Sequence, residues 1–164
     1  MAEKEGPGPY AWDRFTRKVM VHAPLAAVYA AWTRPNDLEG WFLRSADYRD
    51  PQGKPRPKGD PVQVGDIYSW TWYGYDGPPE EGRVLEANGR DLVRFTFAGE
   101  CEVEVRMLPK GTAIEVVLEQ SQIPLDEASK VRIHMGCSIG WVTHLQNLRS
   151  VLQGGLDLRE KGAA

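Results

Sequence analysis

Three histidines and two cysteines are the side chains of this 164-residue chain best suited to metal binding or nucleophilic chemistry. The spacings of His22, His134 and His144 match no zinc pattern. Cys101 and Cys137 are far apart in sequence: they could form one disulfide, but two reduced, buried thiols in a cytoplasmic protein are the alternative we favour. No glycine-rich phosphate loop, nucleophile elbow or paired-cysteine motif occurs. We therefore expect no metal and no cofactor, and we assign no catalytic residue.

His134 is the histidine with the clearest functional alternative. Its imidazole could hydrogen-bond a ligand carbonyl or act as a base, or it could simply be satisfied by a neighbouring hydroxyl or backbone group. Only Glu127 shares its helix face at helical spacing, which weakens a catalytic interpretation. Glu100, Glu102 and Glu104 form a carboxylate cluster, but strand alternation puts them on a solvated outer face rather than in a cleft.

Aromatic residues are the unusual part of the composition, with six Trp, six Tyr and four Phe. Tyr68, Trp70 and Trp72 alternate along one predicted strand, so their rings point the same way. They form either the wall of a ligand pocket or ordinary core packing, and the pattern alone does not separate the two. The predicted ligand-binding set combines these aromatics with the inward histidine: Trp41, Tyr68, Trp70, Trp72, Phe95, Phe97, His134 and Trp141.

The elements that must position these side chains follow from hydrophobic periodicity. Alternation predicts a first strand at 14–21, and Pro24 then opens a helix that Pro35 breaks before a second short helix at about 36–41. Short turns separate further alternating segments, which predict an antiparallel meander of strands at 66–73, 80–86, 91–97, 100–108 and 112–120. The polar, proline-rich segment 49–61 predicts a mobile loop near the pocket mouth.

A helical period replaces the alternation from about Glu127 to Leu152, and Trp141 lies at the centre of the apolar face. Such a helix must cover the concave face of the sheet, and Gly154-Gly155 ends it. Gly136 and Gly140 lie four apart inside it, at a cost of about 1 kcal/mol each relative to alanine, which indicates close backbone packing or no function at all.

These elements predict an α+β, helix-grip fold: a curved antiparallel sheet of about six to seven strands wrapped on a long C-terminal helix, with two short helices after the first strand. The helix-grip domain covers 12–155, between a loose N-terminal tail at 1–11 and a loose C-terminal tail at 156–164. The net charge of −3 and the absence of a basic stripe exclude a nucleic-acid surface. No apolar run suits a membrane span or a signal peptide, so we expect a cytoplasmic protein.

With these predicted elements in this order, the chain resembles the START-like (SRPBCC) superfamily, and within it the domain homologous to the activator of the ninety-kilodalton heat-shock chaperone ATPase. The resemblance covers about Arg14 to Leu152. It is carried by the order and spacing of several short pieces: Val21-His22-Ala23-Pro24, Val28 to Thr33, Pro35, Leu38 to Phe42, Val64-Gly65-Asp66, Gly111-Thr112 and Gly140-Trp141 with Leu145, Leu148 and Leu152. The resemblance implies the helix-grip fold strongly. It implies function only loosely, because the superfamily includes carriers, cyclases, hydroxylase subunits and co-chaperones.

The leading hypothesis is an intracellular domain whose internal hydrophobic cavity binds a small apolar or aromatic molecule. The second is a protein-interaction module, such as a chaperone-ATPase activator homologue, with a protein partner or a homodimer. The third is a cyclase- or dehydratase-like enzyme, which would need two or more polar groups converging in the cavity. His134 is the one such group that the sequence indicates.

Overall fold

Seven antiparallel strands form one sheet in the computed structural model, which describes residues 8–162. The sheet order is β1-β7-β6-β5-β4-β3-β2, so all strands except β1 follow one another as a meander. The strands are β1 (Phe15–Val21), β2 (Ser45–Arg49), β3 (Ile67–Thr71), β4 (Glu80–Ala87), β5 (Leu92–Phe97), β6 (Cys101–Lys110) and β7 (Ala113–Ser121).

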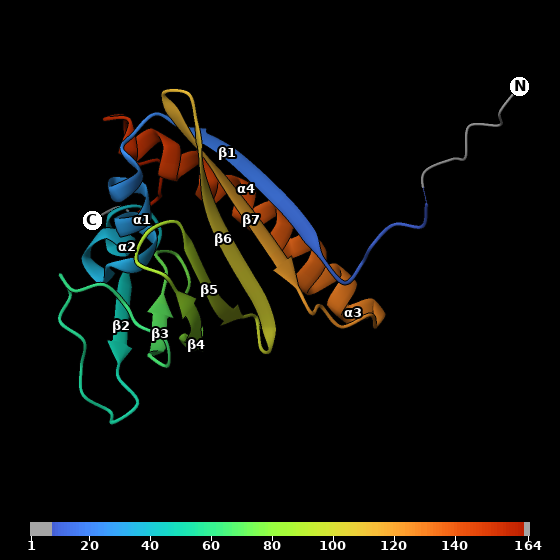
Figure 1. Cartoon of the computed structure of the whole chain (residues 1–164). Helices are drawn as coiled ribbons and strands as arrows, with labels where there is room; N and C mark the ends of the chain where they lie inside the picture. Colours follow the sequence, from blue (N-terminus) through green and yellow to red (C-terminus); the bar gives the residue numbers. More distant parts are fainter. Residues whose placement is uncertain (1–7, 163–164) are drawn as a thin grey trace, which may run out of the picture.

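The helices cover one face of this sheet. Two short helices, α1 (Leu25–Thr33) and α2 (Pro35–Trp41), follow β1. Three consecutive helical segments follow β7: α3 (Glu127–Ser129), the π-helix η1 (Lys130–Met135) and α4 (Gly136–Leu152). Figure 1 shows α4 running along the strands β1 and β7, with α1 and α2 near its C-terminal end. The predicted α+β helix-grip architecture is confirmed.

Alternation and helical spacing explain how the core is filled. In β1, Phe15, Val19 and Val21 are buried while the residues between them face solvent or are half-buried. Trp141 is 2% exposed at the middle of α4, and its indole Nε1 donates to Gln120 Oε1 of β7 at 2.9 Å. The expectation that Trp141 is the central buried residue of the long helix is confirmed.

The strands differ from the sequence-based expectation in two main respects. The short strand β2 was not expected, although Ala46 and Tyr48 alternate with exposed Asp47 and Arg49. Five residues followed by a proline-rich segment give little periodic signal. β3 ends at Thr71, so Trp72 lies just beyond the sheet, at the start of the connection to β4.

The loop after β2 does not adjoin the clefts described below. It makes no large apolar contact, but polar contacts fix it: Arg56 pairs with buried Asp66, and Lys58 pairs with Glu39 and Asp47. The expectation that 49–61 lies at the mouth of the aromatic pocket is therefore wrong for these clefts. The sheet order places β2 at one edge, and charged side chains can anchor a loop that has no apolar residues.

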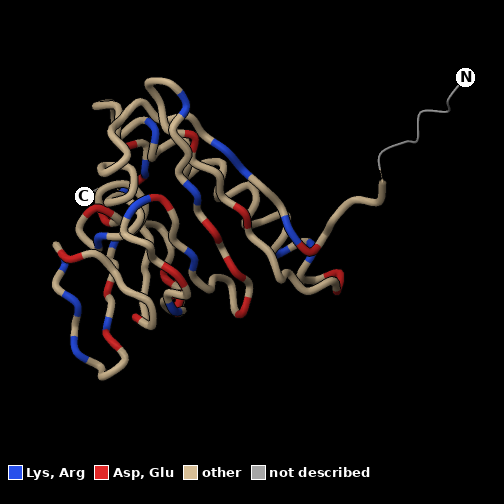
Figure 2. The backbone as a smooth tube through the Cα atoms, in the orientation of Figure 1, with Lys and Arg blue, Asp and Glu red and all other residues tan. Residues whose placement is uncertain are grey.

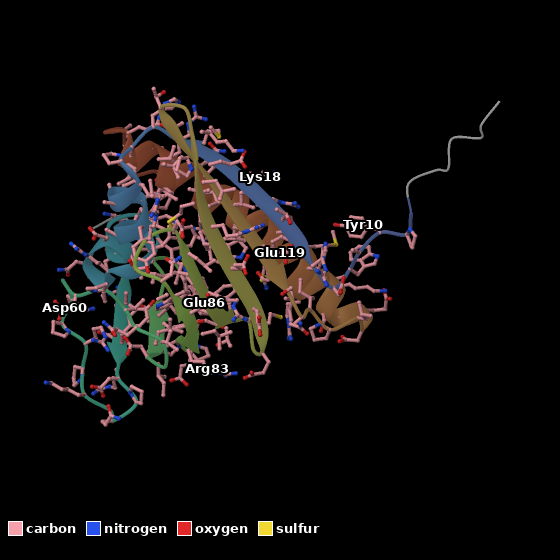
Figure 3. All side chains as sticks on the ribbon, in the orientation of Figure 1. Tyr10, Lys18, Asp60, Arg83, Glu86 and Glu119 are labelled. Atoms are coloured by element: carbon pink, nitrogen blue, oxygen red, sulfur yellow. The ribbon has the colours of Figure 1, made fainter. Side chains whose placement is uncertain are left out.

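The segments expected to be loose tails contact the domain in their described parts; residues 1–7 and 163–164 lie outside the described residues. The Tyr10 hydroxyl lies 2.7 Å from His134 Nε2, and Figure 3 shows Tyr10 beyond the start of β1, at the α3 end of the molecule. At the other terminus, Leu158 N–H donates to Asn147 Oδ1, and the Arg159 guanidinium donates to the carbonyl oxygens of Leu43 and Glu39.

Charged residues of both signs are interspersed along the described backbone, as Figure 2 shows. The three glutamates of β6 and its preceding turn illustrate this: Glu100 pairs with Arg83, Glu102 with Arg94 and Glu104 with Arg106. Among residues 8–162, no helix has both the length and the apolar character needed to cross a membrane.

Candidate functional site

The main candidate site is a cleft between α4 and the connection from β3 to β4, which we call the Trp141 cleft. Its volume is about 520 Å³, within the range typical of small-molecule sites. The lining combines aromatic rings, small residues and several ionisable side chains: Phe42, Trp72, Tyr75, Pro78, Glu80, Phe97, Ala98, Arg132, Gly136, Cys137, Gly140, Trp141 and His144.

A second hollow, the Tyr73 cleft, adjoins the first and has a volume of about 630 Å³. It lies between the same β3–β4 connection, α4 and the C-terminal segment that folds back over the domain. Three residues line both clefts, namely Phe42, Trp72 and His144, so the two hollows meet at these side chains. The remaining lining residues of the Tyr73 cleft are Tyr73, Gly74, Val142, Thr143, Gln146, Asn147, Leu158, Arg159 and Glu160.

Only part of the predicted ligand-binding set faces these clefts. Trp72, Phe97 and Trp141 line the Trp141 cleft. The others belong to the packed core: Trp41, Tyr68, Trp70 and Phe95 are each at most 4% exposed, and Tyr68 and Trp70 stack with ring centroids 3.9 Å apart. The rings of Tyr68 and Trp70 therefore point inward as predicted, but they fill the core. Only Trp72 reaches a cleft.

His134 lies away from both clefts, near the start of the long helix. It is 2% exposed, and both ring nitrogens have partners: Nε2 lies 2.7 Å from the Tyr10 hydroxyl, and Nδ1 lies 2.9 Å from the Trp12 carbonyl oxygen. A ring nitrogen facing a carbonyl must donate, so Nδ1 carries the proton and Nε2 accepts from Tyr10 when the ring is neutral. These contacts match the alternative in which a neighbouring hydroxyl and backbone group satisfy His134.

His144 is the functional candidate that the sequence reasoning missed. Its ring packs edge-on against Phe42, with centroids 4.8 Å apart, and lies 6.0 Å from the Trp141 ring. Within residues 8–162 neither of its nitrogens has a hydrogen-bond partner. Burial and, to a lesser extent, the Arg159 guanidinium lower the pKa of His144 to about 4. The side chain is therefore neutral at pH 7 and offers one donor and one acceptor to the clefts.

The lowered pKa of His144 predicts a pH-dependent stability. The unfolded chain binds a proton at a pKa of about 6.5 and the folded chain only near 4. The contribution of His144 to stability is therefore complete above about pH 6.5 and declines as the pH falls toward 4, by about 3 kcal/mol in total. Urea unfolding at several pH values should show that His144→Phe removes this component, and parallel pH curves for both proteins would contradict the assignment.

Two opposite charges line the Trp141 cleft. Glu80 Oε1 accepts the Ala98 N–H at 2.7 Å, which holds Ala98 in a left-handed conformation with φ 53° at the turn from β5 to β6. Glu80 forms no ion pair within residues 8–162, and neither does exposed Arg132. The structure thus brings Glu80, Arg132 and His144 to one cleft, whereas the predicted His134 lies elsewhere.

The two glycines of the long helix do not make close backbone contacts. A Cβ atom added at Gly140 would meet nothing within 4 Å, and one at Gly136 would meet only the Val131 carbonyl oxygen at 3.7 Å. The prediction of close packing against the short helices is wrong at both positions. Both glycines instead line the Trp141 cleft, where side chains would occupy its volume.

The cysteines are unbridged, and this excludes the disulfide alternative in the described structure. Cys101 is buried at the start of β6, and Cys137 lines the Trp141 cleft from α4. Burial raises the pKa of both thiols, so both are protonated at neutral pH and are poor nucleophiles. In residues 8–162 no three His, Cys, Asp or Glu side chains group in a way that would hold a metal ion.

The arrangement suits noncovalent binding better than catalysis. Aromatic and aliphatic walls supply apolar area, and His144 supplies one neutral polar contact. A histidine with a pKa near 4 is a weak base at pH 7, since efficient general bases have pKa values near the working pH.

Comparison with solved structures places this architecture among known proteins. Protein SSP2350 from Staphylococcus saprophyticus matches with a TM-score of 0.70 and 18% identity over 89% of this chain and 96% of that one. The Aha1 dimer from Colwellia psychrerythraea matches with a TM-score of 0.66 and 15% identity, over 87% and 97%. DynU16, from the dynemicin biosynthetic locus, gives 0.67 and 22% over 91% of this chain but only 50% of its own. At identities this low, the structural similarity shows a shared fold alone.

No curated protein matches the sequence. A family profile described as Activator of Hsp90 ATPase homolog 1-like protein matches residues 22–153. The match begins at the end of β1, continues through the meander and ends one residue beyond α4. It therefore includes α4 and the described lining of the Trp141 cleft, whereas part of the Tyr73 cleft lining, at Leu158, Arg159 and Glu160, lies beyond it. The chain belongs to the family of Activator of Hsp90 ATPase homolog 1-like proteins, and this agrees with its START-like helix-grip fold.

Proposed function

We propose that this protein is a cytoplasmic binding domain that holds a small apolar or aromatic molecule in the Trp141 cleft. The observation that carries the proposal is the lining of this cleft, in which Trp72, Phe97 and Trp141 surround about 520 Å³ of open space. Pockets for small organic ligands are typically concave, largely apolar and provided with a few convergent polar groups. The core aromatics Tyr68 and Trp70 support the walls from behind.

The glycines of α4 provide a test that separates binding from folding. Gly140→Leu places a branched side chain in the cleft, whereas Gly140→Ala adds a single methyl group with no neighbour within 4 Å. Both variants remove a helix-interior glycine, so both should be stabilised, by about 0.5–1 kcal/mol for alanine. Binding of the neutral fluorescent probe N-phenyl-1-naphthylamine should weaken at least about tenfold in Gly140→Leu and little in Gly140→Ala.

Three readouts define the outcome of this experiment. Thermal unfolding checks that both variants fold, and probe fluorescence gives the dissociation constants. Saturable binding to the wild type that Gly140→Leu abolishes supports the proposal. Absence of saturable binding to the wild type, or equal binding by all three proteins, contradicts it.

A protein-interaction module is the second candidate, and one observation favours it. An apolar stripe remains exposed on the outer face of the long helix; it comprises Val131, Met135, Ile139 and Val142, each at least 45% exposed. Exposed apolar patches often mark contact surfaces. The solution dimer of Aha1 from Colwellia psychrerythraea gives a precedent for self-association in this fold. A replacement of Ile139 by Lys should abolish a homodimer detected by light scattering, if one forms, and should leave probe binding unchanged.

A further inference from the structure

We infer that the ligand of the Trp141 cleft is an uncharged aromatic compound whose ring hydroxyl hydrogen-bonds His144 at the junction of the two clefts. The inference rests on the proposed function and deepens it, since it names the chemical class that the same site selects. Its basis is the placement of unpaired polar atoms and charges around the junction.

The junction combines aromatic rings with polar ring nitrogens. Of the three residues that line both clefts, Phe42 has no polar side-chain atom, while Trp72 and His144 carry three ring nitrogens between them. The Trp72 Nε1 is buried with no hydrogen-bond partner within residues 8–162. The nitrogens of half-buried His144 are likewise unpaired there. An unpaired buried polar atom such as Trp72 Nε1 costs about 1–3 kcal/mol, and a ligand that pairs with it recovers part of that cost. The His144 nitrogens are not fully buried, and a ligand would replace water at them.

The orientation of His144 is fixed by its neighbours. The edge-on contact with Phe42 and the contact with Trp141 hold the imidazole between two large rings. A neutral imidazole has one N–H donor and one bare acceptor nitrogen. A phenolic hydroxyl is also both donor and acceptor, so it can pair with whichever nitrogen faces the cleft. A carbonyl could use only the donor, and an ammonium only the acceptor.

The charges around the clefts favour an uncharged ligand. The Trp141 cleft has one carboxylate, Glu80, and one guanidinium, Arg132, and the Tyr73 cleft likewise has Glu160 and Arg159. Arg159 is already engaged with Asp157 and with two carbonyl oxygens. Neither cleft therefore has an excess of one sign to compensate an ionic ligand that leaves water.

A matched pair of compounds tests the hydroxyl directly. 2-Naphthol and 2-methylnaphthalene have the same ring system and nearly the same shape, and differ in a hydroxyl against a methyl group. Each is titrated against N-phenyl-1-naphthylamine bound to wild type, His144→Phe and His144→Gln. The measured quantity is the ratio of the two dissociation constants in each protein, so general changes in apolar affinity cancel.

The expected result is a shift of this ratio by about 3- to 10-fold against 2-naphthol in His144→Phe, the size of one net hydrogen bond. His144→Gln should recover part of the preference, because an amide also donates and accepts. An unchanged ratio in His144→Phe overturns the inference, and so does tighter binding of the anion 2-naphthoate than of 2-naphthol. If the fluorescent probe itself fails to bind the wild type, the proposed function fails, and the two failures are thus distinguishable.

Discussion

Replacement of Trp141 by alanine is expected to lower the free energy of unfolding by about 3–5 kcal/mol. The indole is 2% exposed, and its ring centroid lies 5.2 Å from that of Phe97 and 5.3 Å from that of Phe42. Its removal deletes the largest buried side chain of α4 and leaves a cavity that rigid neighbours cannot fill. It also removes the N–H that donates to Gln120 Oε1, while Gln120 Nε2 is already without a partner.

Urea unfolding monitored by circular dichroism measures this loss, since a lower midpoint at constant slope reports stability alone. Trp141→Phe is the control: it keeps a ring in the site but leaves the Gln120 amide unpaired, at a cost of about 1–3 kcal/mol. A Trp141→Ala protein that melts within a degree or two of wild type would show that α4 does not depend on this residue.

The overall fold could be predicted because its burial is periodic. The alternating residues of β1 and β6 require that one face of the sheet be buried, and the apolar face around Trp141 requires that one side of the helix be buried. A sheet covered by this helix satisfies both requirements. The loop at 49–61 could not be predicted in the same way. Arg56 and Lys58 look like ordinary surface charges in the sequence, and only the fold brings them to Asp66 and Glu39.

The candidate site could be predicted only in part, because a helical period gives the direction of a side chain but not its surroundings along the axis. His134 and His144 both point within about 60° of Trp141 on an ideal helix. The N-terminal end of the helix is covered by Tyr10 and Trp12, which pair with His134, whereas the middle faces the clefts and leaves His144 unpaired. The difference comes from residues more than 120 positions away in the sequence.

The second large effect is expected at the anchor of the β2–β3 loop. Asp66 is fully buried, and its carboxylate accepts from Arg56 Nε at 2.5 Å, Arg56 Nη2 at 2.8 Å and the Gln63 N–H at 2.9 Å. Arg56→Met keeps most of the aliphatic stem but leaves a buried carboxylate with one hydrogen bond. Loss of one partner of a buried ion pair typically costs about 3–5 kcal/mol, and we expect a loss of this size in urea unfolding at pH 7.

The exposed pair between Arg83 and Glu100 gives a matched control for the same substitution. Their side chains are 51% and 81% exposed, against 19% for Arg56 and 0% for Asp66. Arg83→Met should therefore cost less than about 1 kcal/mol, because water screens and replaces an exposed pair. Limited proteolysis adds a local readout: the 50–61 segment should be cut much faster in Arg56→Met than in wild type or Arg83→Met. Equal stability and equal cleavage of the two variants would show that burial of Asp66 does not fix this loop.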